Sequence, residues 1–236
     1  MNSDRTQTKG EDEMTKRTVM PAVSALALIA GLGMAGPANA GWNGFYIGGN
    51  VGYGWGDSVN TWGTPVGTPF TVIDADIDQD GWVGGAHLGN SWMLGTFWVT
   101  GFEVEWDYSN VHGDDGGSGG IVTEISGNWQ AAALARLGVL ITPRTQLYLT
   151  GGYAWYNADM TNFGGLTESH QTTFTGWTYG LGFDRECAGG AMTWGLRYRI
   201  SDYDQERLSF PLTGAGNDYG PQPSIDEFSF RLGWRL

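Results

Sequence analysis

The sequence predicts an all-β protein, an eight-stranded antiparallel transmembrane β-barrel with short turns at one end and long loops at the other. Three observations point to this fold. Apolar side chains alternate with small or polar ones along eight segments, the connections alternate between short and long, and tryptophans gather near the segment ends. After residue 40, no stretch shows the 3.6-residue period of an amphipathic helix.

Each of the eight alternating segments is long enough for the ~10 residues that a tilted strand needs to cross a membrane. In the first segment, Phe45, Ile47 and Val51 fall on one side, and Tyr46 and Asn50 fall on the other. The segments cover residues 45–55, 81–93, 96–108, 126–141, 146–157, 173–184, 191–203 and 228–236. In the fourth segment, which is the least regular, Val139 is expected on the apolar side.

The connections between these segments are of two kinds. Short ones lie around residues 94–95, 142–145 and 185–190. Long ones, rich in Gly, Asp, Asn, Thr and Pro, lie around 57–80, 109–125, 158–172 and 204–224. Short turns on the periplasmic side and long loops on the extracellular side are typical of outer-membrane barrels. An even number of strands places both ends of the barrel on the periplasmic side.

The tryptophans give a separate indication of a membrane environment. Ten of the 12 lie on the apolar side of their segments and near a segment end: Trp55, Trp82, Trp106, Trp129, Trp155 and Trp177 toward the loops, and Trp92, Trp98, Trp194 and Trp234 toward the turns. Indole prefers the membrane interface, so this arrangement predicts two aromatic girdles. A soluble lipocalin-type barrel would instead be polar outside and apolar inside.

The N-terminal segment has the pattern of a secretory signal peptide. Lys16 and Arg17 precede the apolar run "VMPAVSALALIAGLGMAG", and the small residues "ANA" end at Ala40. The run is shorter than the ~20 apolar residues of a spanning helix. We therefore expect residues 1–40 to be removed by cleavage after Ala40, with Met14 as the true start. Residues 41–236 then form the barrel domain in the bacterial outer membrane.

The composition excludes several classes of function. Removal of residues 1–40 takes away four of the 12 basic and four of the 25 acidic residues, including both lysines, Lys9 and Lys16. The remaining eight arginines and 21 acidic residues argue against a nucleic-acid partner, which requires a basic surface. The single cysteine, Cys187, rules out an intrachain disulfide. No motif in the sequence predicts a cofactor.

Charged residues on the polar side of the segments point into the lumen. Paired carboxylates such as Glu103 and Glu105 can carry acid–base catalysis, but ion networks produce the same pattern. An eight-stranded barrel has an interior just wide enough for side chains, where charges require partners. We interpret these residues as a structural ion cluster of Glu103, Glu105, Arg136, Arg197, Arg199 and Arg231. Asp184 and Arg235 are expected on the same side.

Two further motifs suggest metal binding or catalysis. Asp76, Asp78 and Asp80 match the start of a calcium-binding EF-hand loop, but the twelfth position is His87 instead of Glu. We favour the interpretation of this segment as an acidic, solvated loop over a specific metal site. His112 and His170 are expected in loops, and Ser169 beside His170 does not by itself make a nucleophile–base pair. The sequence therefore predicts no catalytic site, and only a weak metal candidate.

The segments "GFYIGGNVGYGWG", "LARLGVLITPRTQLYLTGGYAW" and "TGWTYGLGFD" resemble the small immunogenic outer-membrane proteins. These belong to the porin-like, eight-stranded superfamily that shares its design with outer-membrane protein A, and the resemblance covers essentially the whole mature chain. It implies recognition of the C-terminus by the barrel-assembly machinery. The family usually ends on an aromatic residue, whereas the assembly signal here is Phe228, Phe230, Trp234 and a terminal Leu236.

The expected function is a non-enzymatic, structural surface protein that supports envelope integrity, with acidic extracellular loops. The first alternative is a narrow, cation-preferring diffusion porin. The second is a lipid A-modifying enzyme, because enzymes of that type occur on this scaffold. Expected partners are outer-membrane lipid, lipopolysaccharide and the barrel-assembly machinery, with host or environmental ligands at the loops.

Overall fold

The fold is described from a computed structural model that covers residues 41–63, 71–114, 122–164, 166–188, 190–206, 208–209 and 218–236. Every regular secondary-structure element within these ranges is a β-strand. No helix in this part of the chain is long and apolar enough to cross a membrane. The predicted all-β class is therefore confirmed.

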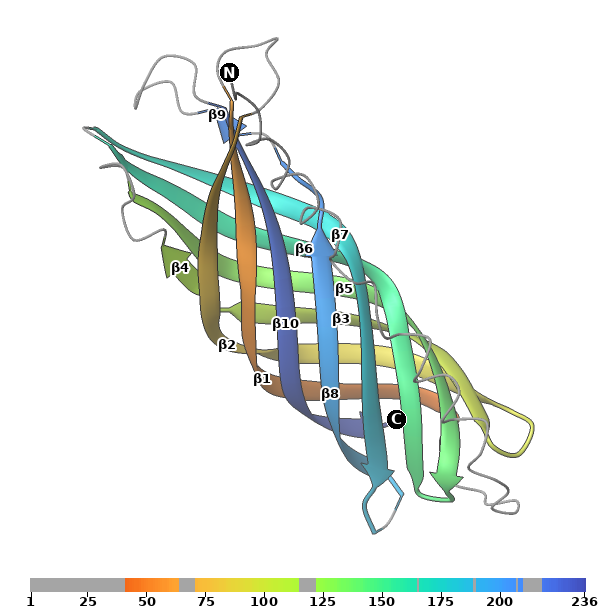
Figure 1. The fold of residues 1–236 in the computed structure, drawn as a ribbon. Helices are drawn as coiled ribbons and strands as arrows, with labels where there is room; N and C mark the ends of the chain where they lie inside the picture. Colours follow the sequence, from red (N-terminus) through yellow and green to blue (C-terminus); the bar gives the residue numbers. More distant parts are fainter. Residues whose placement is uncertain are drawn as a thin grey trace, which may run out of the picture. The chain divides into compact units, whose positions relative to one another are not determined.

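Eight long strands form the barrel: β1 (Gly44–Gly63), β2 (Thr71–Leu94), β3 (Trp98–Ser109), β5 (Val122–Thr142), β6 (Thr145–Gly164), β7 (Leu166–Glu186), β8 (Met192–Tyr203) and β10 (Asp218–Arg235). Each long strand pairs antiparallel with the next long strand along the chain, and β1 pairs with both β2 and β10, which closes the ring (Figure 1). The predicted eight-stranded antiparallel barrel is confirmed.

Two short strands extend this ring at one end. Strand β4 (His112–Asp114) continues the path of β3, and it pairs with β2 and β5. Strand β9 (Leu208–Ser209) pairs with the start of β10.

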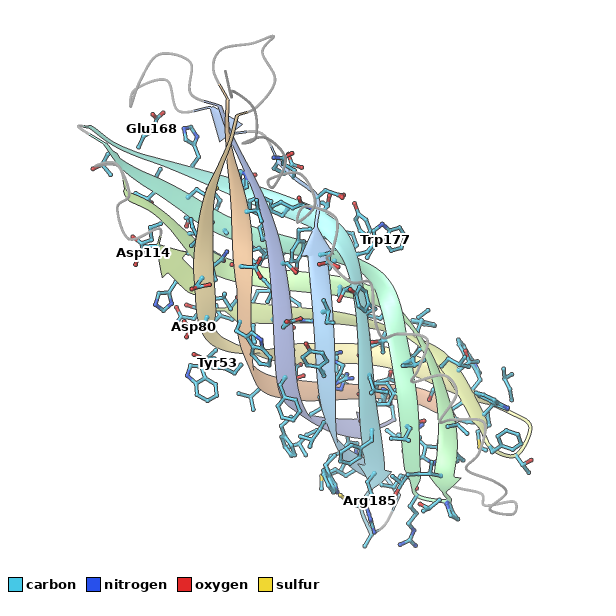
Figure 2. The ribbon with its side chains drawn as sticks, viewed as in Figure 1. Tyr53, Asp80, Asp114, Glu168, Trp177 and Arg185 are labelled. Atoms are coloured by element: carbon cyan, nitrogen blue, oxygen red, sulfur yellow. The ribbon has the colours of Figure 1, made fainter. Side chains whose placement is uncertain are left out.

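The barrel has two distinct ends. Short turns at residues 95–97, 143–144 and 187–191 join strands at what we call the turn end, and the opposite end is the loop end. Gly95 and Gly190 have φ angles of 73° and 76°, a left-handed conformation that suits glycine in tight turns. Figure 2 places Arg185 at the turn end and Glu168 and Asp114 at the loop end.

The strands run further toward the loop end than the sequence predicts. Strand β6 ends at Gly164 and β7 begins at Leu166, so the expected loop at 158–172 is an extended hairpin. In the same way, β1 and β2 occupy most of the expected loop at 57–80. Residues 64–70, 115–121, 165, 207 and 210–217 of the expected loops lie outside the described residues.

Strand β6 shows why these extensions were missed. Near the turn end, Leu147 and Leu149 face outward and Gln146 faces inward, as membrane strands require. Toward the loop end the pattern inverts: Asp159 lies on the outward side, and Met160 on the inward side is completely buried. A strand that leaves the membrane meets water outside and must turn its apolar residues inward. The alternation therefore continues with the opposite polarity.

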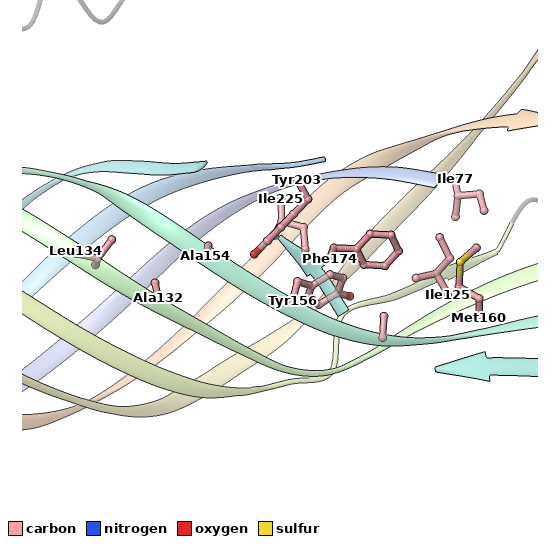
Figure 3. Packing of buried hydrophobic residues seen from close by; sticks show 11 residues of the cluster. Ile77, Ile125, Ala132, Leu134, Ala154, Tyr156, Met160, Phe174, Tyr203 and Ile225 are labelled. Atoms are coloured by element: carbon pink, nitrogen blue, oxygen red, sulfur yellow. The ribbon is translucent and has the colours of Figure 1, made fainter. Parts of the chain in front are cut away.

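An inner apolar cluster lies inside the barrel and extends toward the loop end, where the inverted parts of several strands supply most of its members (Figure 3). Its members come from six of the long strands, with β8 contributing its last residue. They are Ile77, Ile125, Ala132, Leu134, Ala154, Tyr156, Ala158, Met160, Phe174, Tyr203 and Ile225. Tyr156 stacks on Phe174 with ring centroids 6.3 Å apart. The lumen therefore carries an apolar cluster toward this end, beside buried polar side chains such as Gln79 and Ser109.

The girdle tryptophans divide into two groups by exposure. Seven of the ten are exposed on the outer surface: Trp55, Trp82, Trp92, Trp98, Trp106, Trp177 and Trp234. Trp129, Trp155 and Trp194 are half-buried. The side chain of Trp62 lies outside the described residues.

Val139 of β5 lies on the side that the alternation predicts. It pairs with Trp98 of β3 and Leu147 of β6, and both of these residues face outward. Val139 is nevertheless only 4% exposed, whereas Leu137 on the same side is 48% exposed. The register of β5 against β6 shifts after this point, between Leu140 and Thr142, and also between Gly127 and Trp129.

Candidate functional site: the barrel lumen

Strand β3 supplies three carboxylates to the lumen. Glu103, Glu105 and Asp107 occupy alternate positions, so all three point inward while Val104 and Trp106 face outward. Each of these three residues is fully or almost fully buried, with at most 4% of its surface exposed. Three buried carboxylates on one strand require cations from other strands.

Strand β8 lies across the barrel from β3, four positions away in the ring of eight, and provides two of these cations. Arg197 makes two contacts with Glu105, from Nη1 to Oε2 at 2.7 Å and from Nη2 to Oε1 at 3.1 Å. Arg199 also forms an ion pair with Glu105. This two-bond geometry is the strongest form of carboxylate recognition by arginine.

Glu103 is the centre of a second group of contacts toward the turn end. Tyr46 donates its hydroxyl to Oε2 at 2.8 Å, and Arg231 donates Nη2 to Oε1 at 2.7 Å. Arg136 and Arg197 lie at 3.5 Å and 3.4 Å from its carboxylate oxygens. Glu103 is thus surrounded by one phenol and three guanidinium groups.

Two acidic residues that the sequence analysis did not assign to the cluster also belong here. Glu227 of β10 accepts Gln130 Nε2 at 2.7 Å and Arg199 Nη2 at 2.5 Å. Asp107 accepts Asn50 Nδ2 at 2.7 Å, and its other oxygen lies 3.8 Å from Arg199. The alternating pattern could have predicted both residues. Asp107 lies on the same side of its strand as Glu105. Glu227 directly precedes the outward-facing Phe228, so it falls on the lumen side.

We call nine buried charged side chains of the lumen the ionic core, which excludes the buried Glu186 at the end of β7. It comprises Glu103, Glu105, Asp107, Asp184 and Glu227 with Arg136, Arg197, Arg199 and Arg231. Every member is at most 9% exposed. The structure therefore brings all six residues of the predicted ion cluster together and adds three carboxylates. Five carboxylates face four arginines, so the lumen carries more acidic than basic groups.

Glycines on neighbouring strands create the space for two inward tyrosines. A Cβ atom on Gly89 would lie 2.4 Å from the Tyr46 ring, and one on Gly182 would lie 2.5 Å from the Tyr148 ring. Arg136 stacks over Tyr148, with 3.5 Å from Cζ to the ring centroid. These inward glycines explain why the polar side of the segments is rich in glycine.

The turn end is closed by Trp42, which the sequence analysis placed outside the girdles. Its side chain is 1% exposed and packs with Val99, Leu140 and Met93. Its indole nitrogen donates to the carbonyl of Pro143 at 3.2 Å. We call Trp42, Met93, Val99 and Leu140 the turn-end plug.

A small cavity lies between the ionic core and the turn end. It has a volume of about 20 Å³, the space of a single water molecule. Its lining includes His87, Arg136, Arg231 and Arg235. Arg235, expected to face the lumen, is half-buried here and lies over the Trp42 ring.

The aspartates of the predicted calcium loop lie in a strand. Asp76, Asp78 and Asp80 are alternate residues of β2, so their backbone positions are spread along the strand, and the side chain of Asp76 lies outside the described residues. Asp80 accepts a hydrogen bond from Tyr53, which lies beside it in Figure 2. Within the described ranges, no three His, Cys, Asp or Glu side chains are grouped to hold a metal ion.

The histidines expected in loops also lie in strands, His112 in β4 and His170 in β7. His170 lies 3.0 Å from Glu168, whereas Ser169 contacts Thr161 on the opposite side of the strand. Ser169 and His170 therefore do not face one another. Cys187 is a free, half-buried thiol in the turn after β7.

These features define a small outer-membrane barrel with a charged and packed interior. Residues 24–235 match the family model of the outer membrane protein beta-barrel domain, and the chain belongs to this family. Its turn end is the periplasmic end, and its loop end is extracellular.

Curated relatives agree with the resemblance seen in the sequence. The chain is 31% identical over 159 residues to the 31 kDa outer-membrane immunogenic protein of Brucella melitensis, covering 60% of this chain and 63% of that protein. The chain thus spans less than two thirds of that relative. It is 28% identical over 192 residues to the 22 kDa outer membrane protein of Rhizobium leguminosarum bv. viciae, covering 81% and 76%.

Among solved structures, the fold is similar to the outer membrane protein OprG of Pseudomonas aeruginosa. The TM-score is 0.48 and the sequence identity is 15%, with 85% of this chain and 99% of that chain covered.

Proposed function

We propose that this protein is a non-enzymatic structural barrel of the outer membrane, with a closed lumen and an acidic extracellular surface. The observation that carries the proposal is the succession of layers along the lumen. The turn-end plug lies toward the periplasmic end, and the ionic core follows it. The inner apolar cluster begins beside the core, where Leu134 and Ala132 pair with Glu103 and Glu105, and continues toward the extracellular end.

Each layer opposes the passage of solutes for a different reason. The ionic core fills the lumen with paired charges, and the cavity beside it has room for about one water molecule. The inner apolar cluster offers a hydrated ion few hydrogen-bonding groups, such as the hydroxyls of Tyr156 and Tyr203, in exchange for the water that the ion would lose there. A solute would have to displace both layers, so a structural role is favoured over a diffusion pore.

The excess of buried carboxylates gives the cation-preferring pore a specific basis as the second candidate. Asp107 Oδ2 is buried without a hydrogen-bond partner in the described part of the chain. A cation that entered the lumen would find this acceptor. For the protein to act as a cation-preferring pore, the inner apolar cluster would have to open so that the cation could pass.

Conductance in planar lipid bilayers separates the two candidates. The purified protein is expected to give no steady channel steps in KCl, and an open eight-stranded or larger pore protein serves as the positive control. As a matched test, Phe174→Ala removes a phenyl ring of the inner apolar cluster that is 0% exposed, and channel steps are expected more readily from this variant than from the unaltered protein. Regular cation-selective steps from the unaltered protein would overturn the closed-lumen proposal.

The lipid A-modifying enzyme has less support, because Ser169 and His170 face opposite sides of β7. Mass analysis of lipid A from cells with and without the protein tests this alternative. Lipid A of equal composition is expected. A change that persists in a Ser169→Ala, His170→Ala double variant would assign the activity elsewhere in the chain, and would contradict the non-enzymatic role.

The proposed partners follow from the two surfaces of the barrel. The outward tryptophans are suited to outer-membrane lipid and lipopolysaccharide, since indole favours the membrane interface. The C-terminal residues are suited to the barrel-assembly machinery, because Phe228, Phe230 and Trp234 face outward on β10. Host or environmental ligands would meet the acidic residues of the extracellular end.

A further inference from the structure

We infer that the α-ammonium group created by cleavage after Ala40 binds the buried carboxylate of Glu186 and thereby locks the turn-end plug in place. Hydrolysis of the Ala40–Gly41 peptide bond consumes one water molecule. It leaves a carboxylate on Ala40 and an ammonium group on Gly41. The inference goes beyond the structural role proposed above and rests on cleavage at the predicted site.

Glu186 is an acceptor whose partner is missing within the described residues. This last residue of β7 is 6% exposed, and its Oε1 atom has no hydrogen-bond partner in the described part of the chain. A buried carboxylate oxygen without a partner is unfavourable, because it has lost its hydrogen bonds to water and gained none in return. A hydrogen-bond donor placed beside Glu186 Oε1 would therefore be stabilising, and a positively charged donor would stabilise it most.

Gly41 brings such a donor to the same place. A Cβ atom built on Gly41 would lie 3.9 Å from Glu186 Oε1 and 3.8 Å from the carbonyl oxygen of Gly190. The nitrogen of Gly41 is bonded to the same α-carbon, and cleavage would free it to turn toward these two oxygens. A carboxylate and a carbonyl at one point can accept two of the three hydrogens of an ammonium group.

Among the described residues, the other charged groups near Glu186 do not contact its Oε1 atom. Arg235 of β10 and Arg144 of the β5–β6 turn both act electrostatically on Glu186. Neither forms an ion pair or a side-chain hydrogen bond with it in the described residues, where Arg235 contacts Ser91 and Trp42 instead. The backbone of Glu186 donates to the Arg144 carbonyl at 2.8 Å, which fixes the strand end.

The residues that follow Gly41 are already tied to the barrel. The Trp42 carbonyl accepts the Ser91 hydroxyl at 2.6 Å, and Asn43 Oδ1 accepts the Met93 backbone N–H at 2.6 Å. An ion pair between Gly41 and Glu186 would add a third contact that fixes this segment. The first two contacts are with β2, whereas the third would be with β7, on the N-terminal side of Trp42. Processing would thus complete the closure of the periplasmic mouth.

The composition of the mature chain offers an unusually clean test. Both lysines, Lys9 and Lys16, precede the cleavage site, so the α-amine of Gly41 is then the only primary amine in the protein. Intact mass and N-terminal sequencing of protein from outer membranes first establish that the chain starts at Gly41. A different first residue would overturn the inference at once.

The folded protein is then treated in detergent with an amine-reactive succinimidyl ester near neutral pH. Only the neutral amine reacts, and an ion pair stabilises the protonated form. Labelling of the Glu186→Gln variant is expected to be on the order of tenfold faster than that of the unaltered protein, and equally fast once both are unfolded. Equal rates in the two folded proteins would refute the ion pair.

A double-variant cycle separates the ion pair from a general effect of Glu186. Four refolded chains are compared: those starting at Gly41 or at Ala40, each with Glu186 or Gln. The additional Ala40 keeps the positive charge but moves it by one residue, about 3.8 Å. Glu186→Gln is expected to lower the unfolding temperature only in the chain that starts at Gly41. The same loss in both backgrounds would contradict the proposal.

Discussion

Arg197 of β8 and Glu105 of β3 form a two-bond ion pair across the lumen, at 2.7 Å and 3.1 Å, although 92 residues separate them in sequence. Both side chains are almost completely buried. This contact joins opposite walls of the barrel, so it constrains the cross-section of the lumen more directly than hydrogen bonds between neighbouring strands.

Replacement of Glu103 and Glu105 together by Gln should lower stability without changing localisation. The substitutions leave buried arginines without their carboxylates, at a cost of about 3–5 kcal/mol for each broken pair. Thermal unfolding in detergent, followed by the mobility shift on gels without boiling, measures the effect. Asp78→Asn on the exposed side of β2 is the control, with about 0.5 kcal/mol or less expected. An unchanged transition in the double variant would count against a stabilising ionic core.

Phe174→Ala should destabilise the extracellular part of the barrel by about 3–5 kcal/mol, because it opens a cavity in the inner apolar cluster. The ring is 0% exposed and stacks on Tyr156. Gln171→Ala on the exposed side of the same strand is the matched control. Proteolysis of the folded protein in detergent, at cleavage sites in β6 and β7, reports the local loss. Similar protection of both variants would show that the cluster contributes little.

Calcium should not bind specifically to Asp76, Asp78 and Asp80. Alternate residues of a strand lie roughly 6.6–6.8 Å apart, too far for carboxylates to surround one ion as an EF-hand does. Titration calorimetry of the protein in detergent is expected to show no saturable heat of Ca²⁺ binding. A saturable heat that disappears in an Asp78→Asn, Asp80→Asn variant would reverse this conclusion.

Deletion of residues 228–236 should abolish insertion into the outer membrane. The deletion removes eight of the 18 β10 residues that pair with β1, together with the outward aromatic residues of the assembly signal. Fractionation of cells and the heat-dependent gel mobility of the product provide the measurement. A truncated protein that still reaches the outer membrane in heat-modifiable form would rule out this role. Leu236→Phe, which restores a terminal aromatic residue, is expected to assemble at least as well.

The alternation of side chains predicted the barrel well because the period of a strand is fixed by backbone geometry. It placed Glu103 and Glu105 inside and Trp106 outside without any knowledge of neighbouring strands. It could not predict where strands end, because β6 keeps its period beyond Trp155 while the polarity of its two faces inverts. A search for apolar outward positions stops at that point, although the strand continues.

The partners within the ionic core were harder to predict than its members. Which arginine meets which carboxylate depends on the stagger between strands, and the register irregularity in β5 between Gly127 and Trp129 leaves no clear mark in the sequence. Trp42 was missed for a different reason. It precedes the first strand, and its burial depends on a mouth formed by Val99 and Leu140 from distant segments.

The paired extensions of β6 and β7 have a consequence for immune recognition. Asp159 and Gln171 are neighbours across this hairpin, although 12 residues separate them in sequence. An antibody that covers such a surface reads side chains from both strands at once, and its epitope exists only while the hydrogen-bonded ladder is intact. Serum raised against the folded barrel should therefore recognise this region poorly after boiling, and linear peptides would reproduce little of it.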